Sequence, residues 1–210
     1  MIDVYNFSHV NKINYKDYVK FEGIENLEHV KDTPLILYTC HFGRFVLPLI
    51  CLAKIFRPMG CIINDASGVP YSERLFRSFK LNLMEKHMKS TFFYTNKRML
   101  KIFKFLKQNG MLVYLVDIEA KEKCKNSFWI NFLNRKMLIY STIIRLTSRT
   151  NARLIPYIAF ESEDGMYPIN CKIMKEIKFN KDDSNEVKMK KILKPLELIN
   201  EKKDQWWISK

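Results

Sequence analysis

The chain has 210 residues, of which 47% are hydrophobic and 28% are charged, so its composition excludes a disordered protein and allows a full hydrophobic core. Lysine and arginine number 36 against 22 acidic residues, and the resulting net charge of +14 favours an acidic partner, such as nucleic acid, an anionic membrane surface or an acidic carrier protein. The five scattered cysteines form no CxxC pair, which argues against a zinc site or a disulfide framework, and we expect neither a metal nor another cofactor.

Six apolar runs rich in β-branched or aromatic residues are typical of strands. In chain order they are residues 35–40, 59–63, 91–94, 111–116, 154–160 and 169–174. Longer stretches have the apolar spacing of helices, at residues 45–56, 72–88, 96–110, 140–152 and 183–203. Because strand and helix alternate through most of the chain, the sequence predicts an α/β fold, a single domain with a mixed, mostly parallel central sheet flanked by helices.

We expect this single domain to span residues 1–210, with an N-terminal extension over 1–18 and a basic C-terminal helix and closing segment over 183–210. The helix predicted over 96–110 begins at an Asn cap and stops on Gly110, and Pro195 breaks the C-terminal helix. Residues 1–20 lack the apolar core of a signal peptide, and the most apolar run, 45–53, is too short to span a bilayer. The sequence therefore predicts a protein that is cytoplasmic or peripheral on the inner face of the cell membrane.

His41 stands between a predicted buried strand and a predicted buried helix. Ligands of open α/β sheets bind beyond the carboxyl ends of the strands, which is the position of His41. Gly43 would allow a tight turn or a close approach of the backbone to a substrate. Two interpretations stay open from position alone, a structural histidine at a strand end and a general base or acid.

Several motifs around His41 resemble one enzyme family. Gly23, Glu25 and Leu27 match a G-x-E-x-L segment, and His41, Phe42 and Gly43 match the start of an H-F-G-N-W-E block. Residues 72–79 resemble a second block, with Arg74 or Arg77 as its arginine. Residues 109–156 resemble a third block, in which Asp117 and Pro156 fall at its acid and proline, and residues 204–210 are similar to the closing Q-W-x-W-x-x-x-R.

These motifs are those of the bacterial lipid A secondary acyltransferases, the lauroyl/myristoyl-transferring branch of the lysophospholipid acyltransferase superfamily. The resemblance covers about residues 19–210 and implies a glycerolipid acyltransferase-like fold and a catalytic histidine. It also leads us to expect that the chain lacks the hydrophobic N-terminal anchor of the family.

The chain departs from the family at the acid of the H-x-x-x-x-D/E motif, where it has Val46. Such a carboxylate fixes the tautomer of the imidazole and stabilises the imidazolium, and a valine can do neither. Asp117, at the end of a predicted strand, is the first candidate replacement, although an Asp there can also serve as a turn cap. Asp65 and Glu119 are weaker candidates, and an amine acceptor would need a less activated base.

Further residues are candidates for contact with substrate. We expect Gly43, Arg44, Arg74, Arg77 and Arg135 to bind substrate, because the resemblance implies an arginine on phosphate groups and a guanidinium suits that geometry. Arg135 and Lys136 are also expected at the start of a helix, where anions are favoured. Phe42, Phe45, Phe128 and Phe132 are candidates for the wall of an acyl-chain pocket. Plain alternatives remain, namely a solvated basic face for the arginines and ordinary core for the phenylalanines.

The sequence supports three hypotheses of function. The first is an acyltransferase that moves a fatty-acyl group from acyl carrier protein or coenzyme A to a lipid, glycolipid or amine acceptor, with His41 as general base. The second, prompted by Val46, is a catalytically impaired relative that binds lipid or acyl carrier without turnover. The third, nucleic-acid binding, rests on charge and aromatic content alone, and without a recognisable nucleic-acid-binding motif we do not expect nucleic acid as a partner.

Overall fold

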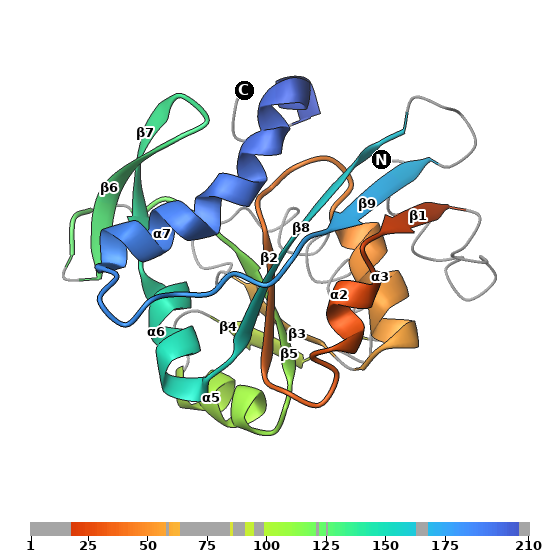
Figure 1. The fold of residues 1–210 in the computed structure, drawn as a ribbon, viewed down its shortest axis with the longest axis horizontal. Helices are drawn as coiled ribbons and strands as arrows, with labels where there is room; N and C mark the ends of the chain where they lie inside the picture. The colour runs from red at the N-terminus through yellow and green to blue at the C-terminus, as the bar shows by residue number, and fades with distance from the viewer. Residues whose placement is uncertain are drawn as a thin grey trace, which may run out of the picture.

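The computed structural model describes residues 18–57, 59–63, 85, 91–94, 99–120, 122–124, 126–162 and 168–205. Seven strands form one central sheet (Figure 1). In spatial order they are β1 (Val19–Glu22), β9 (Ile169–Ile173), β8 (Arg153–Glu161), β2 (Leu35–Thr39), β5 (Met111–Leu115), β3 (Met59–Ile63) and β4 (Thr91–Tyr94). The six strands predicted from the apolar runs are all present in this sheet, and β1 joins them as a short edge strand.

The sheet is mixed and mostly parallel, which confirms the predicted fold class. Strands β8, β2, β5, β3 and β4 pair in parallel, whereas β9 runs antiparallel to β8 and carries β1 parallel to itself. The carboxyl ends of five neighbouring strands therefore meet at one edge of the sheet, the edge at which ligands bind in open α/β folds.

Helices cover both faces of the sheet. Figure 1 shows α2 (Glu25–Glu28) and α3 (Val46–Ile55) on one side, and α5 (Met99–Lys107), α6 (Thr142–Thr150) and α7 (Asn185–Leu193) on the other. A 3₁₀ segment, η2 (Lys194–Gln205), follows α7. The helix predicted over 72–88 lies outside the described residues except for Glu85. Within the described part of the chain, no helix is long and apolar enough to cross a bilayer.

Strand β2 is buried along its whole length because it separates two hydrophobic cores. Leu35 and Leu37 face the core under α3, whereas Ile36 and Tyr38 face the core under α5, α6 and α7. The Tyr38 hydroxyl donates a 2.8 Å hydrogen bond to the carbonyl of Ile192 in α7, and its burial raises the pKa of Tyr38 well above the usual value. A strand apolar on both faces is what a central parallel strand requires.

Two of the helix ends differ in detail from the sequence prediction. After α5, Asn109 and not Gly110 adopts the left-handed conformation, with φ of 59°, and Asn is the residue other than Gly that commonly does so. The α-helical part of the C-terminal segment ends at Leu193, next to Lys194 and Pro195. A proline cannot donate the next helical hydrogen bond, and the chain continues as 3₁₀ turns.

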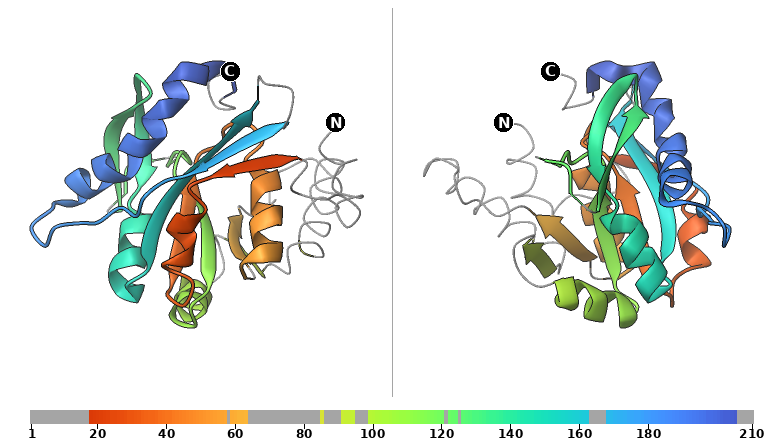
Figure 2. Two further views of the ribbon diagram at one scale, coloured as in Figure 1. Left: turned by 45° about the vertical axis from the view of Figure 1, so that its right-hand side comes forward. Right: turned by 90° about the vertical axis from the view of Figure 1, so that its left-hand side faces the viewer.

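A β-hairpin of β6 (Ser127–Phe132) and β7 (Arg135–Tyr140) was not predicted. It stands beside α7 in both views of Figure 2. Leu133 and Asn134 form its two-residue turn with φ of 51° and 62°, the positive values that a type I′ hairpin turn requires. The prediction that Arg135 and Lys136 start a helix is wrong, because both residues begin a strand.

Candidate active site

The register of two central strands brings His41 and Asp117 together. Thr39 at the end of β2 pairs with Leu115 at the end of β5, and the amide of Val116 donates to the carbonyl of Thr39 at 2.9 Å. His41 and Asp117 each lie two residues beyond this pair. Because the strands are parallel, both side chains emerge at the carboxyl edge of the sheet.

The carboxylate of Asp117 contacts His41 twice. Its Oδ2 accepts a hydrogen bond from the backbone amide of His41 at 2.9 Å, and its Oδ1 lies 2.9 Å from His41 Nδ1. An ionised carboxylate can only accept hydrogen bonds, so Nδ1 carries the proton, and in the neutral ring the free lone pair is on Nε2. The arrangement orients the imidazole with Nε2 as the basic nitrogen.

Burial differs between the two partners in a way that suits proton transfer. The side chain of Asp117 is fully buried, whereas that of His41 is 28% exposed. The imidazole ring of His41 packs edge-on against the ring of Phe45, with the ring centroids 5.8 Å apart. A buried carboxylate behind a partly exposed imidazole is the arrangement in which a histidine acts as an oriented general base.

Gly43 has a backbone reason to be glycine. Its φ is 52°, and a Cβ at this position would overlap the carbonyl oxygen of Ala159 in β8. The turn after His41 therefore lies directly on the backbone of the neighbouring strand. This close approach accounts for the glycine through folding, and contact with a substrate stays a prediction.

Arg44 and Val46 connect this loop to β8 and α3. Arg44 Nε donates to Glu161 Oε1 at 2.8 Å, an ion pair between the loop and the end of β8. Val46 begins α3 and packs, partly buried, against the core under that helix. The position of the missing motif acid is thus filled by apolar packing, while Asp117 supplies a carboxylate to the histidine from another strand.

The family model for the bacterial lipid A biosynthesis acyltransferases matches residues 1–210 of the chain. The chain belongs to this family. Its members are acyltransferases of lipid A biosynthesis, which implies an acyl donor and a lipid acceptor for this enzyme class. No significant match to a curated protein was found.

Cys40 directly precedes His41 in this lipid A acyltransferase but is a poor candidate nucleophile. The thiol is fully buried. Burial, together with the nearby charge of Asp117, raises the pKa of Cys40 well above its ordinary value, so the reactive thiolate is disfavoured. In the described residues, no group of three or more His, Cys, Asp or Glu side chains could hold a metal ion.

The other predicted charged residues either form ion pairs of their own or lie outside the described residues. Arg135 pairs with Glu119 at 3.3 Å, so the weaker acid candidate Glu119 is engaged with an arginine on β7. Arg74, Arg77 and Asp65 lie outside the described residues. Substrate contact by Arg44 and Arg135 stays a prediction.

The four phenylalanines proposed for an acyl-chain pocket are explained by packing. Phe42 and Phe132 are buried in the core under α5, α6 and α7, and the partly buried Phe128 packs against it. Phe45 is buried in the core under α3. Phe42 also borders a pocket of about 140 Å³, which Glu22, Lys172, Glu201 and Lys202 help to line. Core packing accounts for these rings, and their contact with an acyl chain stays a prediction.

Proposed function

We propose that this chain transfers a fatty-acyl group from an acyl thioester to a hydroxyl or amine acceptor, with His41 as general base and Asp117 as the residue that orients it. The observation that carries the proposal is the double contact of the buried Asp117 with the amide and ring of His41. A histidine held by a carboxylate, with its second nitrogen basic, is the arrangement that acyl transfer to a hydroxyl requires.

In the proposed reaction, Nε2 of His41 takes the proton from the acceptor as its oxygen or nitrogen attacks the thioester carbonyl. A tetrahedral intermediate forms, and its collapse breaks the carbon–sulfur bond. The leaving thiolate receives the proton from the imidazolium, which returns the histidine to its neutral form. The charge on Asp117 stabilises the transient imidazolium, as a buried carboxylate does in serine hydrolases.

The position of Asp117 also favours turnover over simple binding. The case for a non-catalytic relative rested on Val46, since a histidine without an acid is a weak base. Asp117 offers the missing carboxylate at hydrogen-bond distance. The charge of +14 fits a donor on acidic acyl carrier protein or anionic coenzyme A, and work at the anionic inner face of the cell membrane.

The test is acyl transfer by purified protein from dodecanoyl carrier protein or dodecanoyl coenzyme A to a lipid acceptor. His41→Ala should lower kcat/KM by roughly 10²–10⁴-fold, the usual contribution of a general base. His29→Ala is the matched control, because His29 is exposed and precedes β2 on the amino side. Full activity in a correctly folded His41→Ala variant would rule out His41 as the base.

A further inference from the structure

A small pocket of about 140 Å³ lies between η2 and the strands β1, β9 and β8. We propose that this pocket binds a small zwitterion, a group with one ammonium and one acid function, as the head group of the acceptor. The assignment to the acceptor rests on the proposed acyl transfer, whereas binding of the zwitterion itself requires no turnover.

The alternation of side chains along the strands builds one wall of this pocket. Successive side chains of a strand point to opposite faces of a sheet. The two neighbours of Lys172 in β9 face the core under α3, so Lys172 points to the other face, toward η2. Glu22 of β1 is the register partner of Lys172. Ile158 and Phe160 of β8 extend the same wall with apolar groups.

The pocket has an apolar floor and a charged mouth. Phe42 and Ile158 are buried, with exposed fractions of 1% and 3%. Glu22, Lys172 and Glu201 are exposed. A ligand would therefore place its carbon atoms on the floor and its polar groups at the mouth. A cavity of about 150 Å³ holds the six carbons of benzene, so this pocket accommodates about six heavy atoms, the size of a short zwitterion.

Each wall of the mouth supplies one carboxylate and one ammonium group. The sheet contributes Glu22 and Lys172, and η2 contributes Glu201 and Lys202. Within the described part of the chain, no ion pair engages the side chains of Glu22, Lys172 or Glu201. A simple anion would be attracted by the lysines and repelled by the carboxylates, and a simple cation the reverse. A ligand that carries both charges is attracted by both pairs.

The neighbouring groove differs because part of its charge is already paired. This groove of about 820 Å³ lies between residues 174–178 and η2 and is lined by three lysines and three glutamates among its apolar residues. Of these, Glu176 pairs with Arg153 at 3.1 Å and Lys191 pairs with Asp183 at 2.6 Å. The smaller pocket therefore has the better defined set of available charges.

The aromatic lining of the pocket is compatible with an ammonium group. Lys202 Nζ lies 5.2 Å from the centroid of the Phe160 ring, within the range of a cation–π interaction. This contact also holds the lysine at the wall of the pocket, where it can pair with an acid group of the ligand.

The pocket adjoins the loop that bears His41. Phe42, which lines the pocket, directly follows His41 in the chain. A Cβ on Gly43 would lie 3.1 Å from the Cα of Phe160, so the loop rests against the strand that forms the pocket wall. An acceptor whose head group is bound here has its remaining part next to the loop of the proposed general base.

The experiment measures binding of β-alanine and O-phosphoethanolamine to the purified protein by isothermal titration calorimetry. The first zwitterion carries a carboxylate and the second a phosphate, so the comparison identifies the acid group. At least one of them should bind tenfold or more tightly than propylamine, propionate and ethyl phosphate, which lack one of the two charges.

Variants locate the binding site of the zwitterion. Glu22→Gln and Lys172→Gln should each weaken its binding tenfold or more. Glu28→Gln and Lys101→Gln are the matched controls, because they change exposed residues of α2 and α5 that do not line the pocket, and should leave binding unchanged. Equal binding of zwitterions and singly charged analogues, absence of binding, or equal affinity of pocket and control variants overturns the inference and leaves the proposed function intact.

Activity separates the inference from the proposed function. If a zwitterion binds as expected and the parent transfers no acyl group, the site stands and the proposed function fails. An active parent should prefer lysophosphatidylethanolamine over anionic lysophosphatidylglycerol at least tenfold in kcat/KM, and Glu22→Gln should remove this preference. An active parent without this preference overturns the assignment of the pocket to the acceptor.

Discussion

At the scale of single residues, the two carboxylate oxygens of Asp117 contact two different groups of His41. One oxygen holds the backbone amide of His41, which fixes where the loop leaves the strand, and the other holds Nδ1, which fixes the ring. Because Asp117 is buried, water does not compete for these hydrogen bonds, and each is stronger than its equivalent at the surface. Substitution of Asp117 should therefore affect both the position of the loop and the chemistry of the ring.

Asp117→Asn keeps the size of the side chain but removes the charge and allows the wrong histidine tautomer. We expect kcat to fall by roughly 10²–10⁴-fold with a smaller change in KM, as for the equivalent change in serine proteases. Glu119→Gln is the control, since Glu119 lies two residues away and pairs with Arg135. Steady-state kinetics check the prediction, which would be wrong if the two variants had similar kcat values.

Gly43→Ala distinguishes a folding role for this glycine from a role in substrate binding. The positive φ and the overlap of a Cβ with Ala159 predict a loss of unfolding free energy on the order of 2–4 kcal/mol. Urea denaturation measures this loss. An unchanged midpoint together with a higher KM would instead assign Gly43 to the substrate, as the family resemblance suggested.

The sequence alone limited the carboxylate partner of His41 to a few candidates but did not identify it. Asp117, Asp65 and Glu119 were all candidates because each could fall near the carboxyl edge of the sheet. Only the strand register, which pairs Thr39 with Leu115, selects Asp117 among the described residues. Register depends on contacts between distant parts of the chain, and local sequence patterns do not contain that information.

At the scale of elements, the predicted strands are present, and helices lie within the ranges 45–56, 96–110, 140–152 and 183–203. The helix start expected at Arg135 was wrong, and the hairpin was missed. The runs 127–132 and 135–140 are rich in aromatic and branched residues, and two residues separate them, which is a hairpin signal. The signal was overlooked because the turn sequence, Leu133–Asn134, differs from the Asn-Gly or Asp-Gly pairs that usually form such turns. Burial of Leu133, which is 8% exposed, helps to offset the cost of its positive φ.

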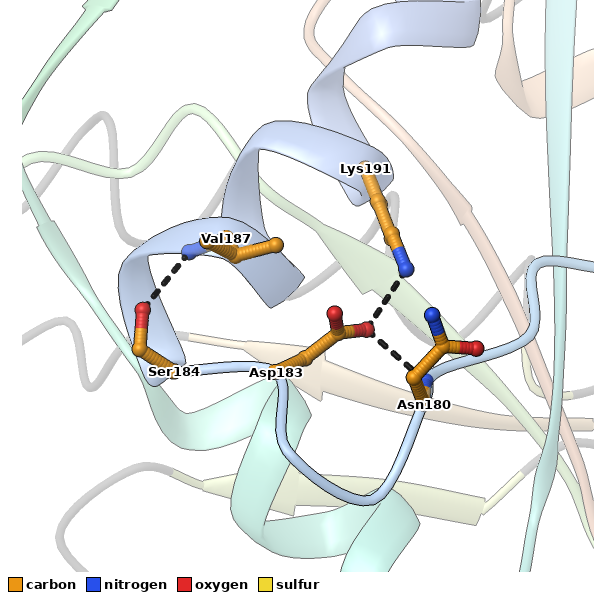
Figure 3. Close-up of polar contacts among 5 residues, drawn as sticks. All are labelled: Asn180, Asp183, Ser184, Val187 and Lys191. Carbon is orange, nitrogen blue, oxygen red and sulfur yellow. Dashed lines mark hydrogen bonds and ion pairs between the residues drawn. The ribbon is translucent and has the colours of Figure 1, made fainter.

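The start of α7 is held by side chains that come from the loop before it. Ser184 caps the helix by accepting a hydrogen bond from the amide of Val187 at 3.3 Å (Figure 3). Asp183 Oδ2 accepts from Lys191 Nζ at 2.6 Å and from the amide of Asn180 at 2.8 Å. The lysine, followed by that amide, lowers the pKa of Asp183 below its usual value.

A lowered carboxyl pKa predicts how α7 depends on pH. Asp183 stabilises the fold above its unfolded pKa of about 3.8, and this contribution is lost as the pH falls through the lower folded value. Asp183→Asn should therefore lower the urea midpoint at pH 7, and should lower it by a smaller amount near pH 3, where the carboxyl is already largely protonated in the unfolded chain. Asp182→Asn is the control on the neighbouring exposed residue. A deficit for Asp183→Asn that is equal at both pH values would contradict this linkage.

At the scale of the whole molecule, the net charge of +14 creates a field that attracts acidic partners over a distance set by salt. Ion pairs reduce this field locally, as between Arg44 and Glu161 or between Arg153 and Glu176. The excess of 36 basic over 22 acidic residues means that many cations remain beyond such pairs. Association with a charged donor should consequently depend on ionic strength.

We expect the KM for an acidic acyl carrier protein donor to rise several-fold between 50 and 300 mM salt, because the Debye length falls from about 14 to about 6 Å over this range. An uncharged thioester, the N-acetylcysteamine derivative of the same acid, should show little change. Initial-rate measurements with both donors provide the comparison. An equal salt response of the two donors would mean that net charge does not guide the carrier.

The proposed base His41 and its partner Asp117 are 76 residues apart in the chain and follow two paired strands. In the H-x-x-x-x-D/E arrangement both groups would lie within a turn or so of one helix, and a locally folded segment could bring them together. Here the contact exists only while β2 and β5 are paired, so under the proposed mechanism a state in which these two strands have separated should be inactive. Loss of activity on heating or in denaturant should coincide with unfolding of the sheet. A partly folded chain should therefore show no acyl-transfer activity.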